Sequence, residues 1–533
     1  PSRGLGDVYK RQLHDLFHIK PDGIMTIVLP HGVLFRGGEE GEIRKNLIEN
    51  NHIDAIIGLP ANIFFGTGIP TIIMVLRQKR ENTDVLIIDA SKGFIKEGKN
   101  NKLRASDIKR IADTFIKRES VAKFSRVVSR EEIRSNDYNL NIPRYVDSSE
   151  AAEHWDVYAS MFGGIPTAEI DEMSEFWTAF PALKKALFTE SGIPYVNVST
   201  PDIKSAIKSH PDVVGFEKAF NAAFSTFPAF LKEELIDRMG SIEISKAETV
   251  LSADIFERLK DIPLIDKYAA FQLLDDDWTG ISIDLEMLQT EGFAATKKVD
   301  PNLVIKKKDG KDQEVQEGWV GHIIPFDLVQ ATLLSAETDE LHGLESRLAE
   351  IPSEYESILD EMTEEDKESC NDVLTDEGDA FVPKEVSKKI KELKKDRSPE
   401  SIALRTLLEK VESLVKNEKE IKAEIKAKGA ALQAKTKDTI ESLSDEQALD
   451  LLEKKWIAPL IESIHKLPDT VIDSLVSKIQ ALQNKYATTF FEVEQQISET
   501  EATLSGMIDD LEGNEYDMLG LNELKKLLGG SAE

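Results

Sequence analysis

Four short apolar segments lie near the start of this chain, and they constrain its fold more than any other feature. They read IMTIVLP (24–30), IDAIIGL (53–59), TIIMVL (71–76) and VLIIDA (85–90), and a helical pattern with acidic residues in its first turn fills 39–50. Nearly continuous apolar strands are typical of a sheet that is covered on both faces. We therefore expect the strand at 24–30 to be buried on both faces. The order predicts the end of an α/β sheet whose last strands pair antiparallel, with one half of the sheet missing.

The 533 residues carry their charge unevenly, although the total is −31. Residues 1–150 hold 24 Lys and Arg against 20 Asp and Glu, whereas the remainder holds 42 basic and 77 acidic residues. Phosphate neutralisation needs Lys and Arg, so only the first part is suited to a polyanionic ligand. A chain of this length also predicts several domains.

The single cysteine excludes a disulfide framework and favours a reducing, cytoplasmic location. Cys370 lies in the acidic segment EEDKESCNDVL, which should raise the pKa of its thiol and make it a poor nucleophile. No apolar run reaches the roughly 20 residues that a membrane-spanning helix needs, so we expect no membrane partner.

The composition of successive segments divides the chain into five predicted regions. Residues 1–12 match no helical or strand period, and we interpret them as a non-native junction segment, which implies that the natural N-terminus is missing. The α/β region at 13–147 should continue with a polar loop at 91–102, helices at about 105–118 and 129–135, and an extended segment at 139–146. Residues 148–330 predict a mainly helical domain with an aromatic core made of Trp155, Phe162, Phe176, Trp177, Phe188, Phe216, Phe220, Phe227 and Phe230.

Two heptad stripes predict an antiparallel coiled-coil hairpin over 331–440. The first stripe comprises Leu341, Leu344, Leu348, Ile351, Tyr355, Ile358 and Met362, and the second comprises Leu404, Leu407, Val411, Leu414, Ile421, Ile425 and Leu432. The C-terminal helical segment at 441–533 should contain one further long helix at about 468–511.

The familiar catalytic and metal-binding motifs are absent from the sequence. Gly66-Thr67-Gly68 precedes a strand, whereas a phosphate-binding loop follows a strand and opens a helix. His14 and His18 have helical spacing but no third ligand, so we predict no metal site. Neither a nucleophile elbow nor a Walker loop occurs.

Several longer motifs in the first region point to a family. They are LPHGVLFRGG (29–38), Ile43-Arg44, LPANIF (59–64) and TGIPT (67–71), followed by Phe94, EGKN (97–100) and NDYNLNIPRYVD (136–147). Together they resemble the later half of the catalytic domain in the modification (methyltransferase) subunit of type I restriction-modification systems. Weaker similarities to the C-terminal region of longer members lie at 163–171, 456–464 and 511–521.

The resemblance implies a methyltransferase that transfers a methyl group from S-adenosylmethionine to adenine N6 in double-stranded DNA. It also implies two partners, which are a specificity subunit that reads the sequence and a restriction subunit with translocase and nuclease activity. A flipped adenine is normally held by aromatic stacking, and the resemblance makes Phe64 the first candidate for that role and Phe65 the second. The alternative is that both rings pack beneath the sheet edge. The remaining motif residues expected near the site are Pro30, Arg36, Gly37, Asn62, Thr67 and Gly68.

Two elements that this family needs do not occur in the 533 residues. They are a Gly-rich cofactor loop and an Asn-Pro-Pro-aromatic loop, and the sequence contains no Pro-Pro dipeptide at all. We therefore predict a fragment that has no catalytic residue or cofactor-binding residue of its own and is inactive alone, although its parent is an enzyme. The alternative is a non-catalytic coiled-coil assembly or docking protein. The absence of a strand-Gly-x-Gly-x-x-Gly-helix unit argues against an oxidoreductase.

Overall fold

The computed structural model describes residues 16–64, 68–149, 153–192, 194–308, 311–375, 379–396 and 398–528. The chain divides into two compact units, which we describe separately. The first unit comprises the residues up to Phe227, Glu248–Trp278 and the residues from Leu460 onward. The second comprises Pro228–Ala247 and Thr279–Pro459.

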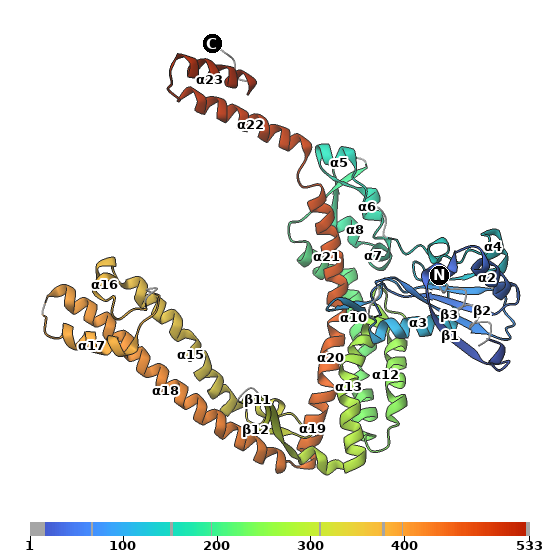
Figure 1. Cartoon of the computed structure of the whole chain (residues 1–533), viewed down its shortest axis with the longest axis horizontal. Helices are drawn as coiled ribbons and strands as arrows, with labels where there is room; N and C mark the ends of the chain where they lie inside the picture. The colour runs from blue at the N-terminus through green and yellow to red at the C-terminus, as the bar shows by residue number, and fades with distance from the viewer. Residues whose placement is uncertain are drawn as a thin grey trace. The chain divides into compact units, whose positions relative to one another are not determined.

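The first unit is built on a five-stranded mixed sheet (Figure 1). Its spatial order is β1 (Ile24–Pro30), β3 (Thr71–Arg77), β2 (Ile53–Gly58), β4 (Val85–Asp89) and β7 (Ser125–Val128). Strand β3 is antiparallel to both of its neighbours, β2 and β4 are parallel, and β7 is antiparallel to β4. The strands predicted from the four apolar segments are therefore present, and antiparallel pairing occurs on both sides of β3.

Helices flank this sheet at the positions that the sequence predicts. They are α2 (Glu39–Glu49), α3 (Ala105–Lys117) and α4 (Arg130–Ser135), and 3-10 turns lie at η1 (His31–Leu34) and η2 (Ile142–Arg144). Alternate residues of β2 face two different apolar clusters. Ile56 packs with Leu47 and Leu29 on one face, whereas Ile57 packs with Leu86 and Ile111 on the other. The sheet is thus covered on both faces at its centre.

Three predictions for this region are wrong, and one strand was missed. Strand β1 is an edge strand whose Ile24 and Val28 are 48% and 49% exposed, because within the described residues it pairs only with β3. The short strand β7 was not predicted. Residues 91–102 are not a loop but include a hairpin of β5 (Ile95–Glu97) and β6 (Asn100–Lys102). Residues 139–146 are not extended, because Pro143 sits in the 3-10 turn η2.

The first unit continues with short helices and a small three-stranded sheet. The strands lie in the order β8 (Ile165–Pro166), β10 (Tyr195–Val198) and β9 (Phe188–Glu190). The helices are α5 (Val157–Phe162), α6 (Thr167–Asp171), α7 (Ser174–Ala179), α8 (Leu183–Leu187), α9 (Ile203–Ser209), α10 (Pro211–Phe224), α21 (Leu467–Lys485), α22 (Phe490–Asp509) and α23 (Glu515–Leu527). Phe176, Phe216 and Phe220 are buried as predicted, but Trp155 and Phe162 are exposed and do not belong to the core.

The single long helix predicted at 468–511 is in fact two helices. Helix α21 ends at Lys485, and α22 begins at Phe490. The hydroxyl of Thr489 accepts a hydrogen bond from the backbone N–H of Glu492 at 3.1 Å, and the carboxylate of Glu492 accepts one from the N–H of Thr489 at 3.0 Å. This capping box starts a new helix, so the apolar stripe is interrupted there.

The second unit contains a β-hairpin and a pair of long helices. The hairpin joins β11 (Val299–Lys308) to β12 (Lys311–Gly321). The segment 148–330, predicted as mainly helical, thus also contains a three-stranded sheet in the first unit and this hairpin in the second. The helices of this unit are η3 (Lys232–Asp237), η4 (Phe293–Lys297), α14 (Phe326–Leu333), α15 (Ser335–Glu361), α16 (Glu364–Ser369), α17 (Pro383–Leu393), α18 (Pro399–Glu441) and α19 (Asp445–Trp456). Four further helices, with residues at or across the unit boundaries, are α11 (Phe227–Leu231), α12 (Ile244–Arg258), α13 (Lys267–Glu291) and α20 (Ala458–His465).

Helices α15 and α18 carry the two predicted heptad stripes and run antiparallel beside each other (Figure 1). Lys410 pairs with Glu361 at 3.0 Å, and Lys435, farther along α18, pairs with Glu337 near the start of α15. The described part of the segment between them contains α16 and α17, and Cys370, directly after α16, is buried beside Val386 and Ile390 of α17. The coiled-coil hairpin and the predicted domain boundaries remain predictions.

Candidate functional site

The predicted site residues converge on one edge of the five-stranded sheet. Strands β1, β2 and β4 run in the same direction, so their carboxyl ends meet at this edge, beside the amino end of β3. The register places Pro30 opposite Thr71, and Gly58 opposite both Ile72 and Asp89. In open α/β sheets, ligands bind outside the carboxyl ends of the strands.

Two loops at this edge, one between β1 and α2 and one between β2 and β3, carry the motif residues. Pro30 ends β1, and Arg36 and Gly37 follow in the turn that leads to α2. Asn62 and Phe64 follow β2, and Gly68 precedes β3. Phe65 and Thr67 lie outside the described residues.

Phe64 presents its ring at the surface. It is 42% exposed and belongs to neither of the two apolar clusters that cover the sheet. This exposure favours a ring that is free to stack on a ligand over a ring that packs beneath the sheet edge. Its role as the base platform stays a prediction.

The backbone of the loop before Phe64 is held by a turn at Asn62 and by hydrogen bonds from Asn101. Asn62 has a left-handed conformation (φ 54°), which Asn tolerates better than most residues. A β-carbon at Gly68 would lie 3.0 Å from Oδ1 of Asn62, so the absence of a side chain at Gly68 allows this close approach. The side chain of Asn101, from β6, donates to the carbonyl of Ala61 at 2.7 Å, and its backbone N–H donates to the carbonyl of Asn62 at 2.9 Å.

The loop after β1 is held by Arg44, which projects from α2. Its guanidinium donates to the carbonyls of Tyr138 at 2.7 Å, Val33 at 2.8 Å and Arg36 at 3.0 Å. Arg44 is only 4% exposed. The sequence motif includes this residue, but its positioning role follows only from the structure.

A polar group at the end of β4 was not predicted. Asp89 accepts a hydrogen bond from the hydroxyl of Ser148 at 2.5 Å and one from the backbone N–H of Ser91 at 3.0 Å. Burial lowers the pKa of His31, and the negative charge of Asp89 opposes that shift. The neutral form of His31 is therefore favoured, and its imidazole can donate one hydrogen bond and accept another at this edge. The position of His31 directly after an apolar strand was the available sequence signal.

The absence of a site for S-adenosylmethionine in this chain stays a prediction. The one turn with adjacent glycines between a strand and a helix, Gly37-Gly38 before α2, leads into a first turn with Glu39, Glu40 and Glu42. These carboxylates would repel the carboxylate of the cofactor. Among the residues that the structure describes, no group of three or more His, Cys, Asp or Glu side chains could hold a metal ion.

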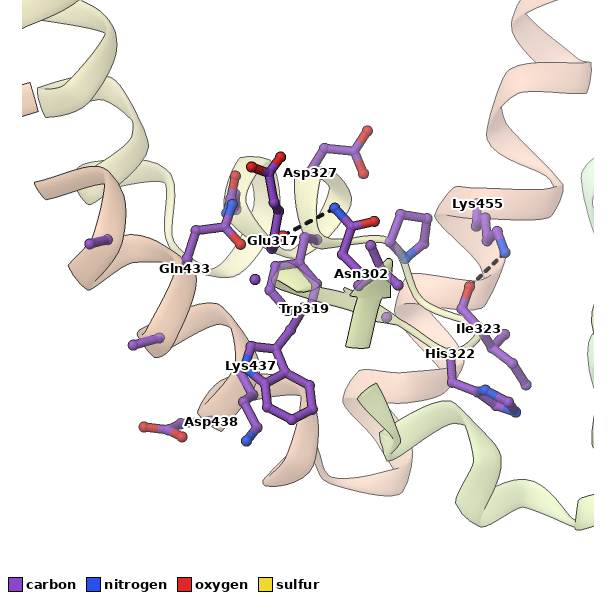
Figure 2. A pocket seen from close by; sticks show the side chains of 18 residues that line it. Asn302, Glu317, Trp319, His322, Ile323, Asp327, Gln433, Lys437, Asp438 and Lys455 are labelled. Atoms are coloured by element: carbon purple, nitrogen blue, oxygen red, sulfur yellow. Dashed lines mark hydrogen bonds between the residues drawn. The ribbon is translucent and has the colours of Figure 1, made fainter. Parts of the chain in front are cut away.

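A large cavity of about 1270 Å³ lies in the second unit, between the β11–β12 hairpin and helices α14, α18 and α19. Figure 2 shows Trp319 and Lys437 side by side in it, with the ammonium 4.0 Å from the ring centroid. Elsewhere in the lining of this cavity, Lys455 donates a hydrogen bond to the carbonyl of Ile323 at 2.6 Å. None of the predicted site residues lies in this unit, so this cavity is not part of the candidate site.

Comparison with known proteins identifies relatives of the first region. Residues 9–154 match the family model described as N-6 DNA Methylase. The methylase subunit of the type I restriction enzyme MpnII from Mycoplasma pneumoniae is 39% identical over 146 residues, which are 27% of this chain and 27% of that protein. The MjaVII methylase subunit from Methanocaldococcus jannaschii is 42% identical over 137 residues, which are 25% of this chain and 24% of the relative.

A solved structure also aligns with this chain. It is the methyltransferase subunit of a type I restriction-modification system from Streptococcus thermophilus, with 52% sequence identity, a TM-score of 0.26 and coverage of 27% of this chain and 30% of that one. The chain spans about a quarter of the length of the curated relatives it matches. The family match covers every predicted site residue. Among the described helices, none combines the length and the apolar composition that a membrane crossing requires.

Proposed function

Residues 9–154 are related to the methylase subunits of type I restriction enzymes, as the sequence motifs predicted, and from this premise we propose the function of the whole protein. We propose that the chain is part of a modification subunit that methylates adenine N6 in double-stranded DNA. S-adenosylmethionine would supply the methyl group. The exposed ring of Phe64 at the carboxyl edge of the sheet is the observation that carries this proposal.

The proposed role of Phe64 is to stack on the adenine after it leaves the duplex. An enzyme that modifies a base must extrude it first, and an aromatic face compensates for the lost stacking in the helix. The fixed backbone at Asn62, which Asn101 holds, keeps the ring close to the strand ends. His31 and Asp89 lie at the same edge and can orient polar groups of the base by hydrogen bonding.

The test compares two phenylalanine variants in the complete modification enzyme with its specificity subunit. Loss of one base-stacking contact costs about 1–3 kcal/mol. Phe64→Ala should therefore lower the rate of DNA methylation about five- to 150-fold at about 1.4 kcal/mol per decade. Phe65→Ala should cost less. Phe17→Ala, at a ring that is also exposed but follows no strand end, should leave the rate unchanged. Equal rates for the Phe64 variant and the wild type, with folding intact, contradict the proposal.

We also propose that the 533 residues do not methylate DNA by themselves. The sequence lacks both the Asn-Pro-Pro-aromatic loop and the Gly-rich cofactor loop, and the three acids in the first turn of α2, after Gly37-Gly38, support this proposal. Calorimetric titration of the chain with S-adenosylmethionine should give no saturable heat. A micromolar binding isotherm would show that the chain holds its own cofactor site.

The C-terminal helices support the proposal of a protein partner, namely the specificity subunit. The segment that contains α22 and α23 exposes a set of apolar side chains, here called the apolar stripe, which comprises Phe490, Val493, Ile497, Leu504, Met507, Leu511, Leu519 and Leu524. The segment 490–527 has ten acidic and only two basic residues, which suits a partner with basic flanks. Ile497→Asp with Met507→Asp should abolish co-purification with the specificity subunit, whereas Leu303→Asp with Ile305→Asp, at exposed apolar residues of β11, should not. The same stripe would serve the alternative function, a non-catalytic docking protein, and the methylation assay separates the two.

The restriction subunit is proposed as a further partner of the complex on the family resemblance alone. The proposed location is the cytoplasm, where a buried, unpaired thiol such as that of Cys370 stays reduced.

A further inference from the structure

A short basic segment stands out within the first unit. Residues 92–104 contain five basic residues and one acidic residue, Glu97. This excess of four equals the whole positive balance of residues 1–150, so the remainder of that region is neutral on average. The centre of the segment is the β5–β6 hairpin, whose turn contains Gly98 in a left-handed conformation (φ 61°).

The lysines of this hairpin are accessible. Lys96, Lys99 and Lys102 are all exposed. Within the described ranges, Lys99 has no acidic partner, and Lys102 pairs only with the exposed Glu97, at 3.1 Å. Surface ion pairs of this kind contribute little to stability, so Lys102 can exchange Glu97 for a phosphate at small cost.

The hairpin is attached to the loop that carries Phe64. Asn101 lies on β6 directly before Lys102, and it is 6% exposed. Its two hydrogen bonds, to the carbonyls of Ala61 at 2.7 Å and Asn62 at 2.9 Å, join the hairpin to the loop. Phe64 follows Asn62 by two residues, so their Cα atoms lie within about 7 Å of each other. These hydrogen bonds therefore hold the hairpin with its lysines beside the loop that carries the exposed ring of Phe64.

We propose that the β5–β6 hairpin is a phosphate-binding site for duplex DNA. The ammonium groups of Lys96, Lys99 and Lys102 contact phosphodiester oxygens close to the adenine that Phe64 receives. This inference rests on the proposed function and adds to it the surface that positions the substrate. Contacts to phosphate fix the register of a protein on the duplex without reading sequence. They suit a subunit whose base readout belongs to a partner.

The negative charge of the residues after 150 disfavours binding of DNA to that part of the chain. The residues after 150 hold 77 acidic against 42 basic side chains, so a polyanion is repelled there. The hairpin therefore offers DNA a local positive surface at the site edge. Asn101 gives it a fixed position relative to Phe64, which a mobile lysine tail would lack.

The test measures binding of the full chain to a fluorescent 20-base-pair duplex by anisotropy between 50 and 200 mM NaCl. Each phosphate contact contributes about 0.9 to the slope of log affinity against log salt, so three contacts contribute about 2.7. The triple variant Lys96→Gln, Lys99→Gln and Lys102→Gln should lose this part of the slope. A fourfold rise in salt should then weaken wild-type binding about 40-fold more than it weakens binding of the variant.

The matched control removes three exposed lysines from α18 in the second unit, as Lys416→Gln, Lys419→Gln and Lys426→Gln. It changes the net charge by the same amount and should keep the wild-type slope. Equal losses in both triple variants, or a wild-type chain that does not bind DNA at 50 mM NaCl, would overturn the proposal. Circular dichroism of both variants should match the wild type, and a hairpin variant that folds and keeps the full slope also overturns it.

This binding assay does not depend on methyl transfer. If the hairpin variant loses the slope while Phe64→Ala leaves methylation in the complete enzyme unchanged, the phosphate site stands and the base-stacking role fails. If Phe64→Ala impairs methylation while the hairpin variant keeps the slope, the base-stacking role stands and the phosphate site is wrong.

Discussion

Replacing Arg44 by methionine removes a guanidinium that joins three parts of the first unit, while the apolar stem of the side chain is kept. The guanidinium donates to the carbonyls of Val33 and Arg36 in the loop after β1, and to that of Tyr138 in the segment after α4. Arg44 is 4% exposed, so water can replace these donors only if the loops move.

The three hydrogen bonds set the size of the effect. A hydrogen bond from a charged donor contributes about 1.5–3 kcal/mol, and a carbonyl left unpaired in a buried place costs about as much. Only the bond to Val33 is fully buried, whereas the carbonyls of Arg36 and Tyr138 lie partly at the surface. Counting the first bond in full and the others at half gives about 3–6 kcal/mol for the local stability of the two loops.

Hydrogen exchange followed by mass spectrometry measures this local stability. The backbone N–H of Leu140 donates to the carbonyl of Leu34 at 2.9 Å and reports on both loops together. At about 1.4 kcal/mol per decade, a loss of about 3 kcal/mol accelerates exchange at Leu140 roughly 100-fold in Arg44→Met. The matched control is Arg126→Met, which breaks the exposed ion pair with Glu132 and should cost less than about 1 kcal/mol. Exchange at Leu140 within threefold of the wild type, or equal effects of both variants, refutes the reasoning.

Three smaller predictions concern other parts of the chain. Thr489→Ala removes the N-cap of α22 and should cost about 1 kcal/mol, seen as roughly fivefold faster exchange of the amides in its first turn. Hydrogen bonds to Asp300 and Glu291 raise the pKa of His322 above its usual 6.5, so its stabilising contribution is complete below about pH 6.5 and is lost as the pH rises through the raised pKa. The destabilisation by His322→Gln in urea titrations should therefore be larger at pH 6 than at pH 9. Burial raises the pKa of the Cys370 thiol, so iodoacetamide at pH 8 should label it only after unfolding.

The strands and helices of the first region could be predicted because their local signals are strong. All six residues of β2 are buried, and its sequence is apolar except for Asp54 and Gly58. Helix α2 begins after a glycine and has three acids in its first turn, as the helix dipole favours. Such features act within a few residues of each other, so the sequence displays them directly.

Strand pairing was harder to predict from the sequence, because it depends on contacts between distant segments. The sequence predicts a strand at 24–30 from its apolar residues, but not that β3 would pair with it and leave its other side exposed within the described residues. The β11–β12 hairpin was missed for a different reason. Its strands carry many charged residues and little apolar alternation, so no period of two marks them.

In the candidate site, too, the residues could be predicted from the sequence, but the long-range hydrogen bonds that hold them could not. Pro30, Asn62 and Gly68 reach one edge because each lies in or beside a strand end, and the family motifs in the sequence were enough to select them. What holds them there was not accessible, because the hydrogen bonds from Arg44 to Tyr138 and from Asn101 to Ala61 join residues 94 and 40 positions apart.

These two side chains also explain how the backbone of the edge holds a defined shape. A loop stays ordered when its buried backbone groups have partners. Arg44 supplies them to the loop after β1, and Asn101 supplies them to the loop that precedes Phe64. Since each bond ends on a backbone carbonyl, it fixes the chain without depending on the side chains that face a ligand. The residues proposed to face DNA can then vary in these loops while the loops keep their positions, because other side chains hold the backbone.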